Sequence, residues 1–177
     1  MTTLYMVELS FPFPDERAGF DEFYSGHISM LLSIEGFRTA QRFEANGNAV
    51  APFMAVYELD DPQVLSSDGY TSRAGPTSVS ETYRPKMLNW DRNLLFGPDL
   101  SLNVPPDGWM VLIDRKRDDA PPLPAQFTPF APVGLDQTVV ERGIWTGSGS
   151  APMAPAQRPG WVVRDMRPLH PQRTAPA

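Results

Sequence analysis

The residue with the clearest capacity for chemistry is His27, one of two histidines in the chain. It lies within residues 15–36, where apolar side chains recur at the i, i+3, i+4, i+7 spacing of an amphipathic helix. An imidazole titrates near neutral pH and can take a proton from carbon or oxygen and return it. Burial on an apolar face lowers its pKa and favours the neutral base. We therefore predict His27 as the catalytic base and acid. The alternative is a core histidine whose ring nitrogens are bonded within the protein.

Side chains near His27 and at the end of the first half could complete such a site. Tyr24 lies one helical turn before His27 and can donate a hydrogen bond to a substrate, although a core role is the alternative. Residues 89–93, Asn-Trp-Asp-Arg-Asn, form a dense polar and aromatic cluster. Here Trp90 can form a stacking wall, Arg92 can anchor a carboxylate and Asp91 can orient a base. The alternative is an Asp-Arg pair that stabilises the junction with the following linker.

Two carboxylates, Glu8 and Glu58, each interrupt an otherwise apolar strand-like segment. If both point inward, they are acid and base candidates, substrate-binding groups, or partners of Arg38 or Arg42. The alternative is that they lie on solvated strand faces or in salt bridges.

Metal and cofactor chemistry has little support in the residue pattern. His27 and His170 are far apart, and no H-x-x-x-H or H-x-H spacing occurs. The chain has no cysteine, which excludes disulfides, thiol catalysis and thiolate metal sites. No glycine-rich loop opens a helix, and no serine lies in a nucleophile elbow. We therefore predict no metal and no cofactor. Haem at His27 is the alternative, because one proximal histidine is enough.

Charge and composition narrow the classes of partner and location. The net charge of the 177-residue chain is -6, which argues against a nucleic-acid backbone or an anionic membrane as partner. No apolar run approaches the ~20 residues of a membrane-spanning helix. No basic region precedes an apolar segment at the N-terminus. These features predict a cytoplasmic protein that acts on a small molecule.

The first half of the chain alternates strands and helices. Strand patterns cover residues 4–11, 37–45, 52–59 and 89–96, and Asn46-Gly47-Asn48 indicates a hairpin. One helix is expected in residues 15–36, with Asp15 as its N-cap and Gly36 at its stop. A second helical region should follow Pro62, interrupted at Gly69, Gly75 and Pro76, and should resume over residues 80–88. The order β-α-β-β-α-β predicts an α+β, ferredoxin-like split βαβ unit in residues 1–97.

The second half is rich in proline and should contain few helices. Residues 98–108 read as a linker, and strand patterns follow at 109–116, 132–147 and 160–169. Residues 109–170 form either a β-rich extension or a degenerate second repeat whose helices became loops, and residues 171–177 form a loose tail. An antiparallel sheet with helices on one face leaves its other apolar face uncovered. A second copy or the rest of this chain must cover it.

The pattern F..FY..H...L..I.GF, from Phe20 to Phe37, followed by a strand and a hairpin, resembles the EthD-like branch of the dimeric α+β barrel proteins. The resemblance covers residues 3–97. It implies a homodimer in which two sheets close into a barrel, with a pocket between each sheet and its helices. Proteins of this superfamily include cyclases, dehydratases, lactone isomerases, cofactor-free monooxygenases, haem-binding enzymes and proteins without known activity.

Together these features predict a cofactor-independent enzyme, of lyase or isomerase type, that acts on a small hydrophobic carbonyl, phenol or lactone by proton transfer at His27. The residue pattern leaves two further functions open. One is a ligand-binding or structural dimer without catalysis. The other is a cofactor-free oxygenase that acts on electron-rich aromatics.

Overall fold

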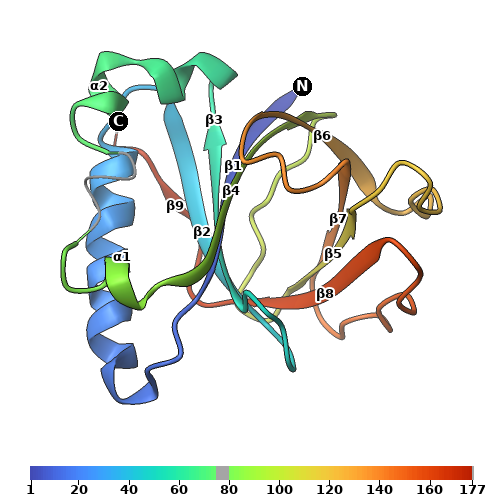
Figure 1. Ribbon diagram of the computed structural model, residues 1–177. Helices are drawn as coiled ribbons and strands as arrows, with labels where there is room; N and C mark the ends of the chain where they lie inside the picture. Colours follow the sequence, from blue (N-terminus) through green and yellow to red (C-terminus); the bar gives the residue numbers. More distant parts are fainter. Residues whose placement is uncertain (75–79, 177) are drawn as a thin grey trace.

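The computed structural model describes residues 1–74 and 80–176 (Figure 1). Short 3-10 turns lie at Pro14–Glu16, Pro62–Ser66 and Arg84–Lys86. The helices are α1 (Arg17–Leu32) and the single-turn α2 (Asp68–Thr71). The strands are β1 (Thr2–Ser10), β2 (Phe37–Ala45), β3 (Phe53–Leu59), β4 (Leu88–Gly97), β5 (Trp109–Arg115), β6 (Thr128–Leu135), β7 (Glu141–Gly147), β8 (Trp161–Pro168) and β9 (Arg173–Thr174).

Eight strands of this one chain close into an antiparallel barrel. The order around it is β3-β1-β4-β6-β7-β5-β8-β2, and β2 pairs back with β3. The first four strands follow the order β4-β1-β3-β2, and the last four follow the corresponding order β8-β5-β7-β6. In Figure 1 the barrel occupies the centre and right of the molecule, and α1 stands at its left side. The second half of the chain therefore completes the barrel that the first half begins.

The predicted fold class is wrong. The molecule is mostly β, and α1 is the only helix longer than one turn among residues 1–74 and 80–176, so it is not an α+β ferredoxin-like dimeric barrel. The free sheet face, which we expected a second copy or the rest of the chain to cover, is covered by β5 to β8 of the same chain. Only Arg84–Lys86 is helical within the helix expected at 80–88, as a 3-10 turn around Pro85. Residues Gly75 and Pro76 lie outside the described residues.

Other local expectations also changed. Asp15 does not cap α1, because it lies inside a 3-10 turn and the helix begins at Arg17 without a side-chain cap. The single strand expected over 132–147 is two strands, β6 and β7, joined by a turn. Gly36 ends the helical region as expected, with a φ of 91° that an L side chain rarely adopts.

Strand β1 separates two apolar cores because its side chains alternate. Tyr5, Val7 and Leu9 point outward and pack against α1, whereas Leu4 and Met6 point into the barrel. Every residue from Thr2 to Leu9 is buried. On the opposite side of the barrel, loops pack on the outer face of the second-half strands, as α1 packs on the outer face of the first-half strands. A third core there contains Val111 and Ile113 of β5, Trp161, and side chains from residues 120–127.

The C-terminal residues expected to form a loose tail contact both β2 and α1. Strand β9 pairs with β2 through Thr39 and Ala40. The Arg173 guanidinium donates a hydrogen bond of 3.0 Å to the backbone carbonyl of Ser25, and another to the hydroxyl of Ser29. These contacts hold the helical turn that carries His27 against the barrel. No helix in the described residues is long and apolar enough to span a membrane.

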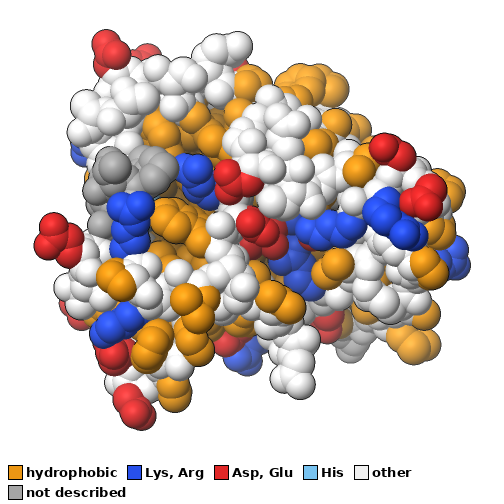
Figure 2. Space-filling view, viewed as in Figure 1, with side chains coloured by type: hydrophobic (Ala, Val, Ile, Leu, Met, Phe, Trp, Pro, Cys, Tyr) orange, Lys and Arg blue, Asp and Glu red, His pale blue; other side chains and the backbone are white. Residues whose placement is uncertain are grey.

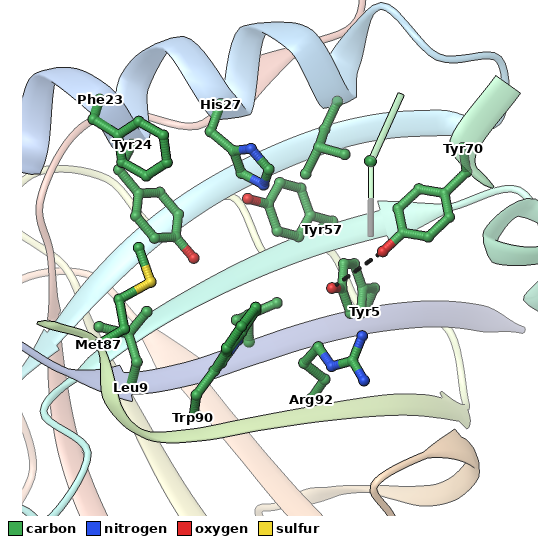
Figure 3. Close-up of a pocket in the computed structure, with 13 residues that line it drawn as sticks. Tyr5, Leu9, Phe23, Tyr24, His27, Tyr57, Tyr70, Met87, Trp90 and Arg92 are labelled. Atoms are coloured by element: carbon green, nitrogen blue, oxygen red, sulfur yellow. Dashed lines mark hydrogen bonds between the residues drawn. The ribbon is translucent and has the colours of Figure 1, made fainter. Parts of the chain in front are cut away.

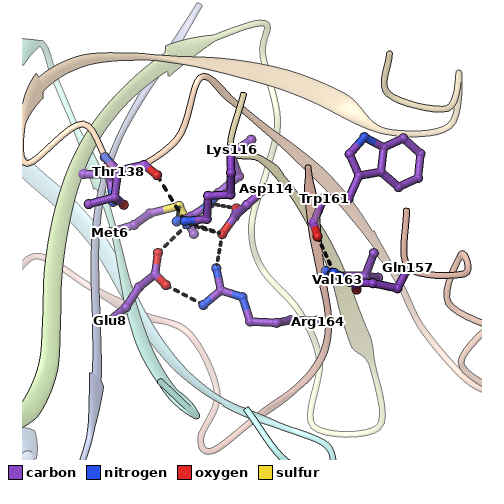
Figure 4. Close-up of polar contacts among 11 residues, drawn as sticks. Met6, Glu8, Asp114, Lys116, Thr138, Gln157, Trp161, Val163 and Arg164 are labelled. Atoms are coloured by element: carbon purple, nitrogen blue, oxygen red, sulfur yellow. Dashed lines mark hydrogen bonds and ion pairs between the residues drawn. The ribbon is translucent and has the colours of Figure 1, made fainter. Parts of the chain in front are cut away.

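Four charged side chains, those of Glu8, Asp114, Arg142 and Arg164, form a ring buried in the barrel interior. Glu8, Asp114 and Arg164 are labelled in Figure 4. Arg142 of β7 donates two hydrogen bonds to Asp114, of 2.5 and 2.9 Å, and one to Glu8. Arg164 of β8 donates to the same two carboxylates, at 2.5 and 2.6 Å. These contacts join β1 of the first half to three strands of the second. The two guanidinium groups lower the pKa of Glu8 and of Asp114 against the opposing effect of burial.

This ring predicts a large loss of stability when one member is removed. Arg142→Met should lower the free energy of unfolding by about 3–5 kcal/mol, because two buried carboxylates would then share one guanidinium. The matched control is Arg167→Met, since Arg167 pairs with Glu44 at an exposed position and its loss should cost under about 1 kcal/mol. Urea unfolding measures both.

The free energy of unfolding of the wild-type protein should depend on pH because of the two carboxylates of this ring, Glu8 and Asp114. Because folding lowers the pKa of both carboxylates, their contribution is full above an unfolded-state pKa of about 4 and is lost as the pH falls further. Equal unfolding free energies for Arg142→Met and Arg167→Met would contradict this account of the barrel.

Candidate functional site

A cavity lies between α1 and the outward face of the barrel (Figure 3). The space not filled by atoms in this cavity and at its mouth is about 480 Å³, a figure that includes open solvent. In the view of Figure 2, apolar side chains gather in a hollow on this face of the molecule, bordered by basic and acidic ones. The cavity is lined by Tyr5, Val7, Leu9, Phe23, Tyr24, His27, Leu31, Tyr57, Tyr70, Ala74, Met87, Trp90 and Arg92.

Four elements supply most of the polar lining. Helix α1 contributes Tyr24 and His27, which lie three residues apart and therefore share a face. The outward positions of β1 and β3 contribute Tyr5 and Tyr57, which are direct cross-strand neighbours with stacked rings 5.5 Å apart. The outward positions of β4 contribute Trp90 and Arg92, whereas Asp91 between them faces the other way. Strand alternation thus selects which members of the 89–93 cluster reach the cavity.

His27 is placed as a neutral base would be. Burial lowers the pKa of its imidazole, and no hydrogen bond from the described residues opposes that effect. Its ring stacks near Phe23, with centroids 6.1 Å apart, and meets Tyr24 edge-on at 5.9 Å. A core histidine was expected to have both nitrogens bonded within the protein. Residues 1–74 and 80–176 provide no such partner, so the ring remains able to accept a proton from a ligand.

Four tyrosines surround the cavity, and three of them are held as neutral phenols. Burial raises the pKa of Tyr24 to about 12 and raises the pKa values of Tyr5 and Tyr57 well above the ordinary value. The hydroxyl of Tyr70 donates to that of Tyr5 at 3.4 Å. Arg42, beneath α1, lies 4.3 Å from the centre of the Tyr24 ring. At neutral pH these hydroxyls are hydrogen-bond donors and not phenolates.

Two buried polar atoms at this cavity have no hydrogen-bond partner among the described residues. The hydroxyl of Tyr57, a residue only 1% exposed, makes no hydrogen bond within the described residues, and neither does the indole nitrogen of Trp90. Figure 3 shows the hydroxyl end of Tyr57 directed toward the side of the cavity where Tyr24 and His27 lie. The Tyr57 hydroxyl lies near that of Tyr24, but the two groups do not meet in hydrogen-bond geometry. Buried polar groups are nearly always paired, so an ordered water or a ligand oxygen is the expected partner of these two atoms.

The structure brings together four of the seven residues predicted as site residues. His27, Tyr24, Trp90 and Arg92 line one cavity. Asp91 lies on the opposite face of β4, directly across from Glu8 on β1. Burial and the nearby Glu8 carboxylate raise the pKa of Asp91.

The two glutamates do not act as an inward-facing pair. Glu8 points into the barrel, but its partners are Arg142 and Arg164 and not Arg38 or Arg42. Glu8 lies opposite Met54 of β3, whereas Glu58 lies four residues further along that strand, opposite Leu4. The Glu58 carboxylate is 3.8 Å from the Arg38 guanidinium. Neither lines the cavity beside His27. Arg42 pairs instead with Asp21, at 2.9 Å.

Sequence reasoning missed Tyr5, Tyr57 and Tyr70 as site residues. Strand alternation puts Tyr5 and Tyr57 on the same faces as their apolar neighbours, but it does not show that those faces meet α1 across a cavity. The available signal was the number of tyrosines on one side of the sheet, because a phenol in a core needs a partner for its hydroxyl.

Comparison with known proteins supports the fold alone. No family model and no curated protein matches the chain. An anthrone oxidase-like protein of known structure aligns over 98% of this chain and 93% of its own, with a TM-score of 0.60 and 7% identity. A protein from Lactobacillus acidophilus, provisionally assigned as a monooxygenase, aligns over 95% of this chain and 94% of its own, with a TM-score of 0.55 and 9% identity. The chain shares their fold over nearly its whole length.

These comparisons correct two expectations. The resemblance to the EthD-like branch is wrong, because the similar structures are the oxidase-like and monooxygenase-type proteins, which match the whole single-chain barrel. The expectation of a lyase or isomerase likewise finds no support in either of them. Within the described residues, no group of three His, Cys, Asp or Glu side chains is arranged to hold a metal ion.

The environment of His27 predicts its titration. Because burial disfavours the imidazolium, the ring should titrate below 6.5 and be neutral at pH 7. The unfolded chain then takes up a proton first as the pH falls, so the contribution of His27 to stability is present above about 6.5 and is lost below it. NMR titration measures this pKa, with His27→Gln used to assign the signal against His170. A midpoint at or above 6.5 would contradict the buried neutral base.

Proposed function

We propose that the protein oxidises an electron-rich, hydroxylated polycyclic aromatic with molecular oxygen and without an added cofactor. The substrate would carry an acidic methylene group next to aromatic rings, as an anthrone does. The observation that carries the proposal is the pair of buried donors, Tyr57 and Trp90, left without partners beside a neutral histidine. This arrangement suits a planar ligand that becomes an oxyanion when it loses a proton.

The first step would be proton transfer. The imidazole of His27 takes a proton from the methylene carbon, and the negative charge moves through the rings onto a carbonyl or phenol oxygen. The Tyr57 hydroxyl or the Trp90 indole N–H can donate a hydrogen bond to that oxygen. Because both donors are buried, their effect on the charge is stronger than it would be in water.

The remaining steps need only oxygen. The carbanion gives one electron to O₂, and the resulting radical and superoxide combine to form a carbon–oxygen bond. The imidazolium of His27 returns its proton to the peroxide. Loss of the second methylene proton with cleavage of the O–O bond then yields a ketone and one water molecule. The methylene carbon is oxidised by four electrons and O₂ is reduced by four, so atoms and electrons balance.

The two similar structures favour an oxygenase over a protein that only binds its ligand. One of them is described as anthrone oxidase-like and the other provisionally as a monooxygenase. The aromatic walls of the cavity, formed by Phe23, Tyr5 and Trp90 among others, suit a polycyclic ligand. A ligand-binding protein without catalysis is the second candidate, because the same unpartnered donors would also hold an inert aromatic ketone.

A measurement of oxygen uptake distinguishes an oxygenase from a protein that only binds the ligand. With 1,8-dihydroxyanthrone as probe and a chelator present, the wild-type protein should consume O₂ and form the anthraquinone faster than the buffer alone. His27→Gln should lower kcat by about 10²- to 10⁴-fold, the usual contribution of a positioned base. Tyr57→Phe should lower kcat about 10- to 100-fold through the loss of one oxyanion donor.

The matched control is Tyr83→Phe, which removes a hydroxyl from a ring that packs on Phe23 outside the cavity lining. It should leave kcat within about twofold. Binding of the probe with no oxygen uptake above background would overturn the oxygenase proposal in favour of a binding protein. Full turnover by His27→Gln would overturn the role of His27.

A further inference from the structure

The guanidinium of Arg92 has unused hydrogen-bonding capacity at one side of the cavity. It makes no side-chain hydrogen bond with any described residue, and its one ion-pair contact is Asp136, with 3.7 Å between Nη2 and Oδ1. That distance is too long for a hydrogen bond. The Asp136 carboxylate instead accepts the backbone N–H of Arg92 through its other oxygen, at 2.8 Å. The acidic neighbour is therefore held by the backbone, and the guanidinium is left largely unpaired.

The Arg92 side chain lines the cavity and is partly buried. The Arg92 side chain is 21% exposed, and in Figure 3 it points up from β4 toward Tyr5. Burial raises the pKa of Tyr5, and the positive charge of Arg92 opposes that rise. The centre of the guanidinium lies 5.8 Å from the Trp90 ring, so cation and aromatic surface adjoin.

The rest of the cavity has no group that would neutralise this cation. None of the described residues that line it is Asp or Glu. Its polar atoms are mainly donors: the Tyr57 hydroxyl, the Trp90 indole N–H and the forked N–H groups of Arg92. A ligand that matched this lining would present oxygen acceptors to all three and a negative charge to Arg92.

We propose that the ligand of this cavity is an aromatic carboxylate, whose rings lie against Trp90 and the tyrosines and whose carboxylate pairs with Arg92. A carboxylate fits better than a single phenolate oxygen, because the planar guanidinium presents two parallel N–H groups that match two oxygens. This inference names the substrate class of the proposed oxygenase and so rests on that function for its catalytic meaning. Its binding component can be tested without turnover.

The test uses oxidised, unreactive ligands so that only binding is measured. Anthraquinone-2-carboxylate and its carboxamide have nearly the same shape and differ in charge. Titration calorimetry on the wild-type protein should show about tenfold or tighter binding of the carboxylate. Arg92→Gln should remove that preference while leaving the carboxamide affinity within about threefold. Arg92→Lys should retain part of it, because the charge remains but the paired N–H groups do not.

The matched control is Arg38→Gln, which removes a cation that is exposed and pairs with Asp60 and Glu58 away from this cavity. It should leave the preference unchanged. Equal binding of the two ligands by the wild type, absence of binding of both, or a preference that survives in Arg92→Gln would each overturn the proposal. Preference for the carboxylate without oxygen uptake in the turnover assay would leave the binding site standing and overturn the oxygenase alone.

Discussion

Strand β1 is the element on which both the barrel and the cavity depend. It lies between β3 and β4, and both of its faces are buried. One of its inward side chains is Glu8, which pairs with Arg142 and Arg164 in the buried charged ring. Its outward side chains include Tyr5, which forms part of the cavity wall beneath α1. Because side chains alternate strictly along a strand, a shift of one residue in register would exchange the two sets.

The charged ring therefore has a consequence for the cavity. Glu8 can meet its two arginines in one register of β1 only, and that register fixes Tyr5 opposite Tyr57 on β3. On β4 the same pairing places Asp91 opposite Glu8, and turns Trp90 and Arg92 outward. The buried ions contribute specificity of arrangement, which is the best attested role of such groups. The positions of the cavity side chains therefore depend on contacts made inside the barrel.

The cavity itself is left incomplete by the protein. An unpaired buried donor costs about 1–3 kcal/mol of stability, and Tyr57 and Trp90 each carry a donor that no residue in 1–74 or 80–176 pairs with. The chain offsets this elsewhere through three apolar cores and through the contacts of Arg173 with α1. Local destabilisation of this kind is common where a ligand completes the structure.

The sequence predicted the local elements better than their assembly. Residues 15–36 did contain the main helix, and the strands of the first half lie close to their expected positions, because apolar periodicity and turn residues are local signals. The barrel could not be read in the same way, because the pairing of β4 with β6 and of β2 with β8 joins residues far apart in the chain.

The site residues also divide into those that local patterns predicted and those that depend on pairing between distant segments. His27 and Tyr24 followed from helical spacing, and Trp90 and Arg92 from their polar and aromatic neighbourhood. Sequence alone did not reveal which face of β4 would meet α1, so Asp91 was grouped with them. The partners of Glu8 come from β7 and β8, and no local pattern connects them to β1.

The most direct test of this account is a crystal structure with 1,8-dihydroxyanthraquinone, the product expected from the anthrone probe. The account predicts the ligand between α1 and β4, with one of its oxygens about 2.7–3.2 Å from the Tyr57 hydroxyl or the Trp90 indole nitrogen. A ligand seated elsewhere, such as at the barrel mouth beside Lys116 and Arg164, with Tyr57 and Trp90 still unpaired, would contradict it.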